Sequence, residues 1–221
     1  MACKVLVVCG SPVVASADLL RRLAGECDHV VAVDRGLDAL LGAGLGCDVY
    51  VGDADTVSEA GRALVDAAED FEVERHDPYK DYTDLALALD SVRRRWPGVE
   101  VVATCATGGR PDMALSVLGL LASYADAPVW IAEDDTTARI LHAGESWTIE
   151  GAEGKTFSII AIAPNTKVSE HGLEWELDHA PLGLLADTGI SNIVRGTAKI
   201  TVHQGTAIAY LLREGFIGTV G

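Results

Sequence analysis

The stretch Val49-Tyr50-Val51-Gly52-Asp53-Ala54-Asp55-Thr56 places an apolar run directly before a short acidic loop. Similar apolar runs recur on both sides of it, and segments with helical spacing separate them. Continuous apolar strands are typical of a parallel sheet that is covered on both faces. The pattern therefore predicts a doubly wound α/β domain with a mostly parallel sheet. The acidic loop is expected at the carboxyl end of one of its strands.

Six strands and four helices are expected in this domain. The predicted strands are Val5–Val8, Val30–Val33, Val49–Val51, Phe71–Glu74, Val99–Ala103 and Val129–Ala132. Helical spacing of leucine and valine follows Ser16, Ser58, Thr83 and Asp112, which are the expected N-caps. The segment Trp96-Pro97-Gly98 is expected to end the third of these helices.

The pattern changes at about Thr136, where helical spacing disappears and short strands follow at close intervals. Turn formers such as Pro164-Asn165 and His171-Gly172 separate these strands. We therefore expect an α/β domain over residues 1–135 and a small antiparallel β-sandwich over residues 136–221. Its predicted strands are Ala138–His142, Ser146–Glu150, Thr156–Ala161, Leu173–Leu177, Ile193–Val194, Ala198–Val202 and Ala207–Leu211.

The composition limits the classes of partner and location. The chain has 221 residues and a formal net charge of −16 at pH 7. This acidity repels a nucleic-acid backbone, so nucleic acid is not an expected partner, and an anionic substrate needs a metal or local cations to bind. No segment reaches the roughly 18 apolar residues of a membrane span. Five cysteines without a CxxC pair favour free thiols, and no signal-peptide pattern is present, so the cytoplasm is the expected location.

The loops that follow the predicted strands of the first domain are unusually acidic. Ligands of open α/β sheets bind beyond the carboxyl ends of the strands, so these loops are the expected site. They are Asp34-Arg35-Gly36 after the second strand, residues 52–56 after the third, residues 77–84 after the fourth and residues 107–112 after the fifth.

Each acidic or glycine-rich element has two interpretations. In an extended segment, the spacing of Asp53 and Asp55 points both carboxylates to one side, where they can share a hard cation. The alternative is a solvated acidic turn. Asp84, at an expected helix start, is either a site residue or a helix cap. Gly108-Gly109-Arg110 either brings backbone N–H groups and a guanidinium to a phosphate or forms an ordinary turn.

The combination of these loops indicates phosphoryl transfer assisted by a metal. Carboxylates hold Mg²⁺, Mg²⁺ bridges phosphate oxygens, and lysine and arginine side chains offset the charge that develops during transfer. The chain contains neither a GxxxxGK[ST] P-loop nor the HRD and DFG motifs of protein kinases. The common nucleotide-binding folds are therefore not supported.

In this order, the motifs resemble those of the thiamine pyrophosphokinase family. The resemblance extends over nearly the whole chain in six elements, each of which is a weak match by itself. In the first domain, Val33–Gly36 is similar to Ala-Asp-Gly-Gly, Gly52–Thr56 to Gly-Asp-Phe-Asp-Ser, Asp81–Asp84 to Asp-x-Thr-Asp and Gly109–Asp112 to Gly-Gly-Arg-x-Asp-His. In the second, Gly172–Leu177 is similar to Gly-Leu-x-Trp-x-Leu and Ser191-Asn192 to Ser-Asn.

The resemblance implies transfer of the diphosphate of ATP to thiamine, which gives thiamine diphosphate and AMP. It also implies a homodimer in which thiamine binds between the α/β domain of one subunit and the β domain of the other. By this resemblance Asp53, Asp55 and Asp81 hold Mg²⁺, and Asp84 assists them or orients the attacking hydroxyl. The implied substrate-binding residues are Asp34, Lys80, Thr83, Arg110, Asp112, Trp175, Ser191 and Asn192. Arg110 and Lys80 stabilise phosphate charge, and Trp175 stacks on a thiamine ring.

The sequence departs from the family pattern at four positions, which are expected to affect the shape of the substrate pockets. Arg35 replaces a glycine, Ala54 an aromatic residue, Met113 a histidine and Ser116 a position where asparagine is common. One alternative is a diphosphokinase of another small alcohol, such as a hydroxymethylpterin, and another is a non-catalytic ligand-binding relative. Without the resemblance, Trp175 is interpreted as a core aromatic of the sandwich.

Overall fold

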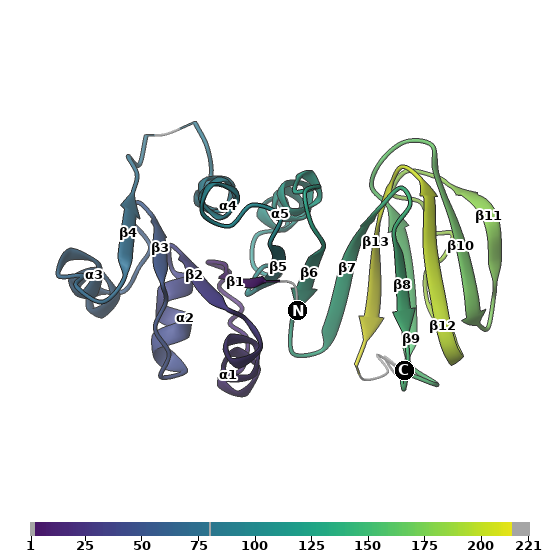
Figure 1. The fold of residues 1–221 in the computed structure, drawn as a ribbon, viewed down its shortest axis with the longest axis horizontal. Coiled ribbons are helices and arrows are strands. Elements are labelled where there is room, and N and C mark those ends of the chain that lie inside the picture. Colours follow the sequence, from purple (N-terminus) through teal and green to yellow (C-terminus); the bar gives the residue numbers. More distant parts are fainter. Residues whose placement is uncertain (1–2, 80, 214–221) are drawn as a thin grey trace. The chain divides into compact units, whose positions relative to one another are not determined.

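The computed structural model describes residues 3–79 and 81–213, and the chain divides into two compact units, Met1–Asp134 and Asp135–Gly221 (Figure 1). This division lies one residue from the expected boundary. The N-terminal unit alternates strands and helices, and the described part of the C-terminal unit contains strands only. Among the described residues, none of the helices combines the length and the apolar character that a membrane span requires.

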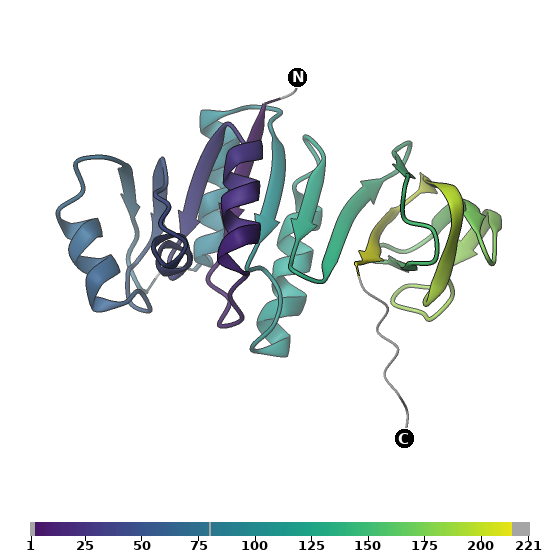
Figure 2. The same ribbon diagram turned by 90° about the horizontal axis from the view of Figure 1, so that it is seen from below.

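The N-terminal unit is a parallel sheet with helices on both faces, as the apolar runs predict. Its sheet has the order β6-β5-β1-β2-β3-β4. Helices α1 and α2 cover one face, seen in front of the sheet in Figure 2, and α4 and α5 cover the other. The elements are β1 (Lys4–Val8), α1 (Ala17–Glu26), β2 (His29–Val33), α2 (Gly36–Gly42), β3 (Val49–Gly52), α3 (Glu59–Asp66), β4 (Glu72–Arg75), α4 (Asp84–Arg95), β5 (Glu100–Thr104), α5 (Pro111–Ser123) and β6 (Val129–Ala132).

Three of the four predicted helix caps are confirmed. The side chains of Ser16, Ser58 and Thr83 each accept a backbone N–H from the first turn of α1, α3 and α4. The fourth prediction, Asp112, is wrong, because α5 begins at Pro111 and Asp112 lies inside its first turn. Proline favours the first helical position, since its missing N–H has no intrahelical partner there in any case.

Helix α2 is an element that the sequence patterns did not predict. It has only seven residues, and Arg35 at its N-cap makes no side-chain capping hydrogen bond. Gly36 allows this short helix to approach the sheet closely, because a Cβ atom at this position would lie 2.0 Å from the carbonyl oxygen of Val8 in β1. Contacts with the sheet therefore stabilise α2 in place of local capping.

The C-terminal unit contains two antiparallel sheets that share a long strand. Strands β7, β13 and β9 form one sheet, and β8, β12, β10 and β11 form the other. The start of β12 also pairs with β9, and Trp147 of β8 contacts Phe157 of β9. The strands are β7 (Thr136–His142), β8 (Ser146–Ile149), β9 (Thr156–Ala161), β10 (Thr166–Leu173), β11 (Leu177–Leu182), β12 (Asn192–Gln204) and β13 (Thr206–Leu212).

Three of the predicted strands of this unit need correction. The segment Leu173–Leu177 is the turn between β10 and β11, not a strand. Gly172 has a φ of +75°, and a Cβ atom there would lie 2.2 Å from the carbonyl oxygen of Thr197, so β12 approaches the chain closely just before the turn. The two short strands predicted at Ile193–Val194 and Ala198–Val202 are parts of the single strand β12.

Candidate active site

A cavity of about 460 Å³ lies at the carboxyl ends of the N-terminal unit's strands. Strand β1 pairs with β2 on one side and with β5 on the other, so the chain order reverses there, and such a reversal opens a ligand-binding crevice in α/β sheets. The cavity is lined by residues 9–12 after β1, 33–35 around the end of β2, 53, 55 and 56 after β3, 78 and 82–85 after β4, and 105, 106, 108 and 110 after β5, with 113, 114, 116, 117 and 120 of α5.

Three carboxylates meet in this cavity. Asp34, Asp53 and Asp55 each offer one oxygen, and these oxygens lie within 4.8 Å of one another. Among the described residues, these three side chains are the ones that lie close enough together to share one ion. Asp34, predicted as a substrate contact, therefore joins the two aspartates predicted as metal ligands.

A tight turn, and not an extended segment, brings Asp53 and Asp55 together. Ala54 between them has a φ of +64° and is 1% exposed. Asp53 Oδ1 accepts the backbone N–H of Asp55 at 3.1 Å, which stabilises the turn. The predicted grouping of these two carboxylates is thus reached by different backbone geometry. A small residue suits a buried position with positive φ.

Asp34 is held in place by side chains from β3 and the loop after it. It is 8% exposed, accepts a hydrogen bond from the hydroxyl of Tyr50 at 3.3 Å and accepts another from the hydroxyl of Thr56. Gly52 permits this approach, because a Cβ atom there would lie 3.1 Å from the Cα of Asp34. The strand ends of β2 and β3 are therefore packed closely enough to place their carboxylates side by side.

The electrostatics of this group suit a divalent cation. Loss of hydration raises the pKa of Asp55, and the neighbouring carboxyls of Asp53 and Asp34 raise it further. Carboxylates that repel one another favour either a bound proton or a shared cation. Hard carboxylate oxygens are the ligands that Mg²⁺ prefers, so the residues present fit this ion.

The loop before α4 contributes only some of its predicted residues. Thr83 and Asp84 both line the cavity. The N-cap of α4 is Thr83, and Asp84 is the first residue of the helix, so the interpretation of Asp84 as the helix cap is wrong. Asp81 is exposed and lies outside both the carboxylate group and the cavity lining, as far as the described residues define them. Lys80 lies outside the described residues.

Arg110 and Asp112 pair with each other. Arg110 donates to Asp112 through Nε at 3.2 Å and through Nη2 at 2.6 Å, and both side chains are largely exposed. Arg110 lines the cavity together with Met113 and Ser116, the two positions in α5 that depart from the family pattern. The guanidinium therefore lies at the cavity with its Nε and Nη2 paired with Asp112.

Two parts of the cavity were missed by sequence reasoning. The loop after β1 lines it with Gly10 and Ser11, and the rule that ligands bind at carboxyl strand ends was sufficient to include this loop. Arg35, whose role the sequence did not indicate, lines the cavity and donates from Nη2 to the carbonyl oxygen of Gly10 at 3.2 Å. Its guanidinium adds a second cation to an otherwise acidic site.

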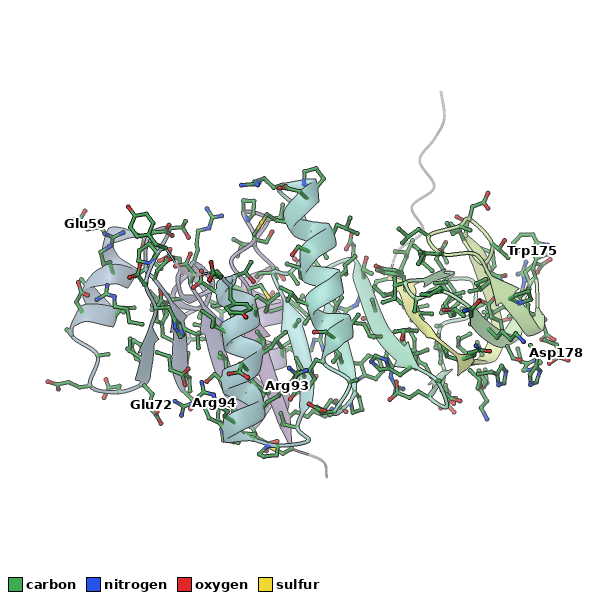
Figure 3. All side chains as sticks on the ribbon, turned by 90° about the horizontal axis from the view of Figure 1, so that it is seen from above. Glu59, Glu72, Arg93, Arg94, Trp175 and Asp178 are labelled. Carbon is green, nitrogen blue, oxygen red and sulfur yellow. The ribbon has the colours of Figure 1, made fainter. Side chains whose placement is uncertain are left out.

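In the C-terminal unit, Trp175 stands on the surface at the turn between β10 and β11 (Figure 3). It is 63% exposed, so the interpretation as a core aromatic is wrong. Buried Asn192 forms two hydrogen bonds to the backbone of this turn, one as acceptor and one as donor. Its Oδ1 accepts from Trp175 N at 3.1 Å, and its Nδ2 donates to Trp175 O at 2.7 Å. The turn therefore presents an exposed indole on a fixed backbone.

The two polar residues that the resemblance assigns to substrate binding, Ser191 and Asn192, differ in their surroundings. Ser191 is exposed with a φ of +59°, and its backbone N–H donates to the hydroxyl of Ser158 at 3.0 Å. Asn192 is 3% exposed and also donates from Nδ2 to Oε2 of Glu170 at 3.2 Å. Ser191 is accessible to a ligand, whereas Asn192 acts on the turn that carries Trp175.

Glu170 makes the stability of the fold depend on pH. Its side chain is fully buried, and burial raises its pKa to about 7, although the hydrogen bond from Asn192 opposes this shift. Because the folded pKa lies above the unfolded one, the native state retains a proton that the unfolded chain releases. The stabilisation of the native state by this proton is complete below about pH 4.5 and is lost as the pH rises through 7. We expect the free energy of unfolding to fall by up to about 3 kcal/mol over this range.

Urea unfolding of the wild type and Glu170→Gln at pH 5.0 and pH 8.5 measures this effect. In the glutamine variant, the free energy of unfolding should differ much less between the two pH values, because residue 170 then has no proton to lose. The matched control is Glu174→Gln at a nearby position with a half-exposed side chain, which should keep the wild-type difference. An unchanged pH dependence in Glu170→Gln would show that this carboxyl ionises as readily in the native state as in the unfolded chain.

Comparison with known protein families finds two matches along the chain. Residues 20–132 match the family profile described as "Thiamin pyrophosphokinase, catalytic domain", and residues 146–207 match "Thiamin pyrophosphokinase, vitamin B1 binding domain". Two relatives from Arabidopsis thaliana, Thiamine pyrophosphokinase 1 and 2, are 27% and 26% identical over 182 residues. Each alignment covers 75% of this chain and 64% of the relative, so the chain matches less than two thirds of their length.

Solved structures support the same assignment. The thiamin pyrophosphokinase of Geobacillus thermodenitrificans is 25% identical with a TM-score of 0.78, and the alignment covers 96% of this chain and 99% of that one. The Bacillus subtilis thiamine pyrophosphokinase has a TM-score of 0.77 at 23% identity, with 96% and 100% of the two chains covered, which shows a shared fold. The two family profiles together match more than half of the sequence, in the order of its two units. The chain therefore belongs to the thiamin pyrophosphokinase family.

Proposed function

We propose that this chain transfers the diphosphate group of ATP to the hydroxyethyl group of thiamine, giving thiamine diphosphate and AMP. The observation that carries the proposal is the group of Asp34, Asp53 and Asp55 in a cavity at the carboxyl strand ends, in a member of this family. The match of residues 146–207 to a vitamin B1 binding domain favours thiamine over a pterin alcohol as the acceptor.

The proposed metal site consists of Asp34, Asp53 and Asp55, with Asp84 in the same cavity. These carboxylates would hold a Mg²⁺ ion, which would supply positive charge against the negative charge that develops during transfer. Asp81, which the resemblance assigns to the metal, is exposed and outside this group. The geometry thus favours Asp34 as the third ligand.

The proposed reaction is a single displacement at the β-phosphorus. The hydroxyl oxygen of thiamine forms a bond to this phosphorus, and the bond from it to the oxygen bridging the α-phosphorus breaks, so AMP leaves with the bonding electrons. The hydroxyl proton passes to a carboxylate of the cavity, for which we propose Asp84 at the start of α4. Arg110, Arg35 and Lys80 are proposed to stabilise phosphate charge.

Thiamine recognition is proposed to involve the turn between β10 and β11. The exposed indole of Trp175 offers a face on which a cationic aromatic ring can stack. Ser191 is accessible for a hydrogen bond, and Asn192 keeps the turn in position through its bonds to the backbone of Trp175.

We further propose that the chain acts as a homodimer, as its family resemblance implies. Leu115 of α5, which does not line the cavity, is 61% exposed in the single chain, so it is an apolar side chain that a partner subunit would cover. A monomeric mass under assay conditions, measured by analytical ultracentrifugation, would contradict it.

The direct test is incubation of the protein with ATP, Mg²⁺ and thiamine, followed by measurement of AMP and thiamine diphosphate. We expect both products in equal amounts, and no product when EDTA removes the metal. Formation of AMP with a hydroxymethylpterin but not with thiamine would identify a different acceptor. Binding of thiamine without any turnover would identify a non-catalytic relative.

A further inference from the structure

The loop between β5 and α5 forms one wall of the cavity, and its first three backbone amides converge on a single carboxylate. Glu133, just after β6, accepts from Cys105 N at 3.2 Å through Oε2. Its Oε1 accepts from Ala106 N at 2.9 Å and from Thr107 N at 3.2 Å. The hydroxyl of Thr107 also donates to Oε1, at 3.3 Å. One side chain therefore binds four donors of one short loop.

Together these backbone amides form an anion-binding site, and the carboxylate of Glu133 occupies it. Successive backbone N–H groups that point to one place attract a negative charge, and hydrogen bonds to a carboxylate are stronger than those between neutral groups. Cys105 has a φ of +50°, a conformation that a residue with a side chain rarely adopts. Glu133 stabilises the strained backbone by binding the N–H groups that this conformation exposes.

The segment after β1 also contacts the β5–α5 loop. The hydroxyl of Ser11 donates to the carbonyl oxygen of Thr107 at 2.6 Å. Gly108 and Gly109 have positive φ, and a Cβ atom on either would lie less than 3 Å from Val13 or Pro12. The loop is thus packed against residues 11–13, while the bonds to its first three amides come from Glu133.

Glu133 is not among the described residues that line the cavity, whereas Cys105, Ala106, Gly108 and Arg110 are. It therefore acts on the site through the loop and not by contact with a ligand. We propose that Glu133 is a positioning residue, which holds the β5–α5 loop so that Gly108 and Arg110 meet the phosphates of the nucleotide. The nucleotide in this inference rests on the proposed function, but the ordering of the loop does not.

A neighbouring carboxylate provides a matched control. Asp134 follows Glu133 directly and accepts the backbone N–H and the hydroxyl of Ser16, so it holds the start of α1. Both residues follow β6 and accept hydrogen bonds from another loop. Of the two, only Glu133 binds the β5–α5 loop, which lines the cavity. Replacement of either by its amide removes one negative charge and weakens comparable hydrogen bonds.

The experiment compares Glu133→Gln and Asp134→Asn with the wild type in two measurements. Hydrogen exchange reports the order of residues 105–107, and calorimetry with α,β-methylene-ATP and Mg²⁺ reports nucleotide affinity without turnover. We expect Glu133→Gln to speed exchange at these amides at least tenfold and to weaken the Kd about tenfold. Asp134→Asn should change both by less than twofold. Glu133→Asp keeps the charge but reaches fewer amides, and should give intermediate values even if the glutamine variant folds poorly.

The outcomes separate this inference from the proposed function. If Glu133→Gln exchanges faster but binds the analogue as tightly as the wild type, the loop does not need Glu133 to bind phosphate and the inference is wrong. Unchanged exchange would overturn it as well. If the wild type itself does not bind the analogue, the proposed function fails, and with it the ligand assigned to this loop.

Discussion

Replacement of Asp53 by asparagine is expected to lower kcat for thiamine diphosphate formation at least about a hundredfold. The change removes one of three carboxylates that share the proposed metal site. A metal that offsets charge on a transferring phosphoryl group contributes several kcal/mol, and a hundredfold loss corresponds to about 2.7 kcal/mol. The variant should also need more Mg²⁺ for half of its maximal rate. Steady-state kinetics with magnesium titration measures both effects.

The fold should tolerate this substitution well. Asparagine retains the Oδ1 atom with which residue 53 accepts the backbone N–H of Asp55, so the turn through Ala54 is preserved. The control is Asp66→Asn, which removes a carboxylate of the same charge from an exposed ion pair with Arg75. Surface pairs of this kind contribute little to stability, so this variant should keep nearly all of its activity. Full turnover in Asp53→Asn would refute the metal assignment.

A comparison of Asp34→Asn with Asp81→Asn identifies the third ligand. The structure groups Asp34 with Asp53 and Asp55, whereas the motif resemblance assigns Asp81 to the metal. We expect the loss in Asp34→Asn to be close to that in Asp53→Asn, and the loss in Asp81→Asn to be at least tenfold smaller. The reverse order would favour the assignment made from the sequence motif.

Replacement of Trp175 by alanine is expected to raise the KM for thiamine about tenfold to a hundredfold and to leave the KM for ATP within about twofold. A cation stacked on an indole contributes about 2 kcal/mol when it is desolvated, and about 1.4 kcal/mol corresponds to a factor of ten. The free energy of unfolding should change little, because the side chain is 63% exposed. Kinetics with each substrate varied in turn measures the two constants.

Two further variants separate stacking from general loss of apolar surface. Trp175→Phe keeps an aromatic face and should recover most of the affinity for thiamine. Leu184→Ala removes a side chain of similar exposure, 55%, elsewhere in the same unit and should leave both constants unchanged. A thiamine KM that stays constant in Trp175→Ala would exclude this residue from the acceptor site.

Local sequence patterns were sufficient for most of the N-terminal unit. The residues Val5–Val8 form a continuous apolar run because helices cover both faces of β1, and all four are fully buried. The caps at Ser16, Ser58 and Thr83 depend on hydrogen bonds within one turn, so the residue types alone predict them. Each of these features arises from neighbours a few positions apart.

Elements that depend on distant contacts were not predictable in the same way. Helix α2 is short and lacks a capping side chain, and its glycine is needed for close approach to β1. Strand β11 contains Pro181 and mostly polar or half-exposed residues, since it pairs only with β10 among the described strands. Such an edge strand shows little of the alternation that identifies a strand in sequence.

The order of an α/β unit before a β unit, the acidic loops and their family resemblance are all evident from the amino-acid sequence. Two features are evident only in the folded chain: Asp34, and not Asp81, lies beside Asp53 and Asp55, and Glu133 binds a loop more than 20 positions away. The physical reason is that the order of strands in the sheet determines which loops meet at its carboxyl edge. That order follows from packing between distant segments, whereas spacing and capping record only what each segment requires locally.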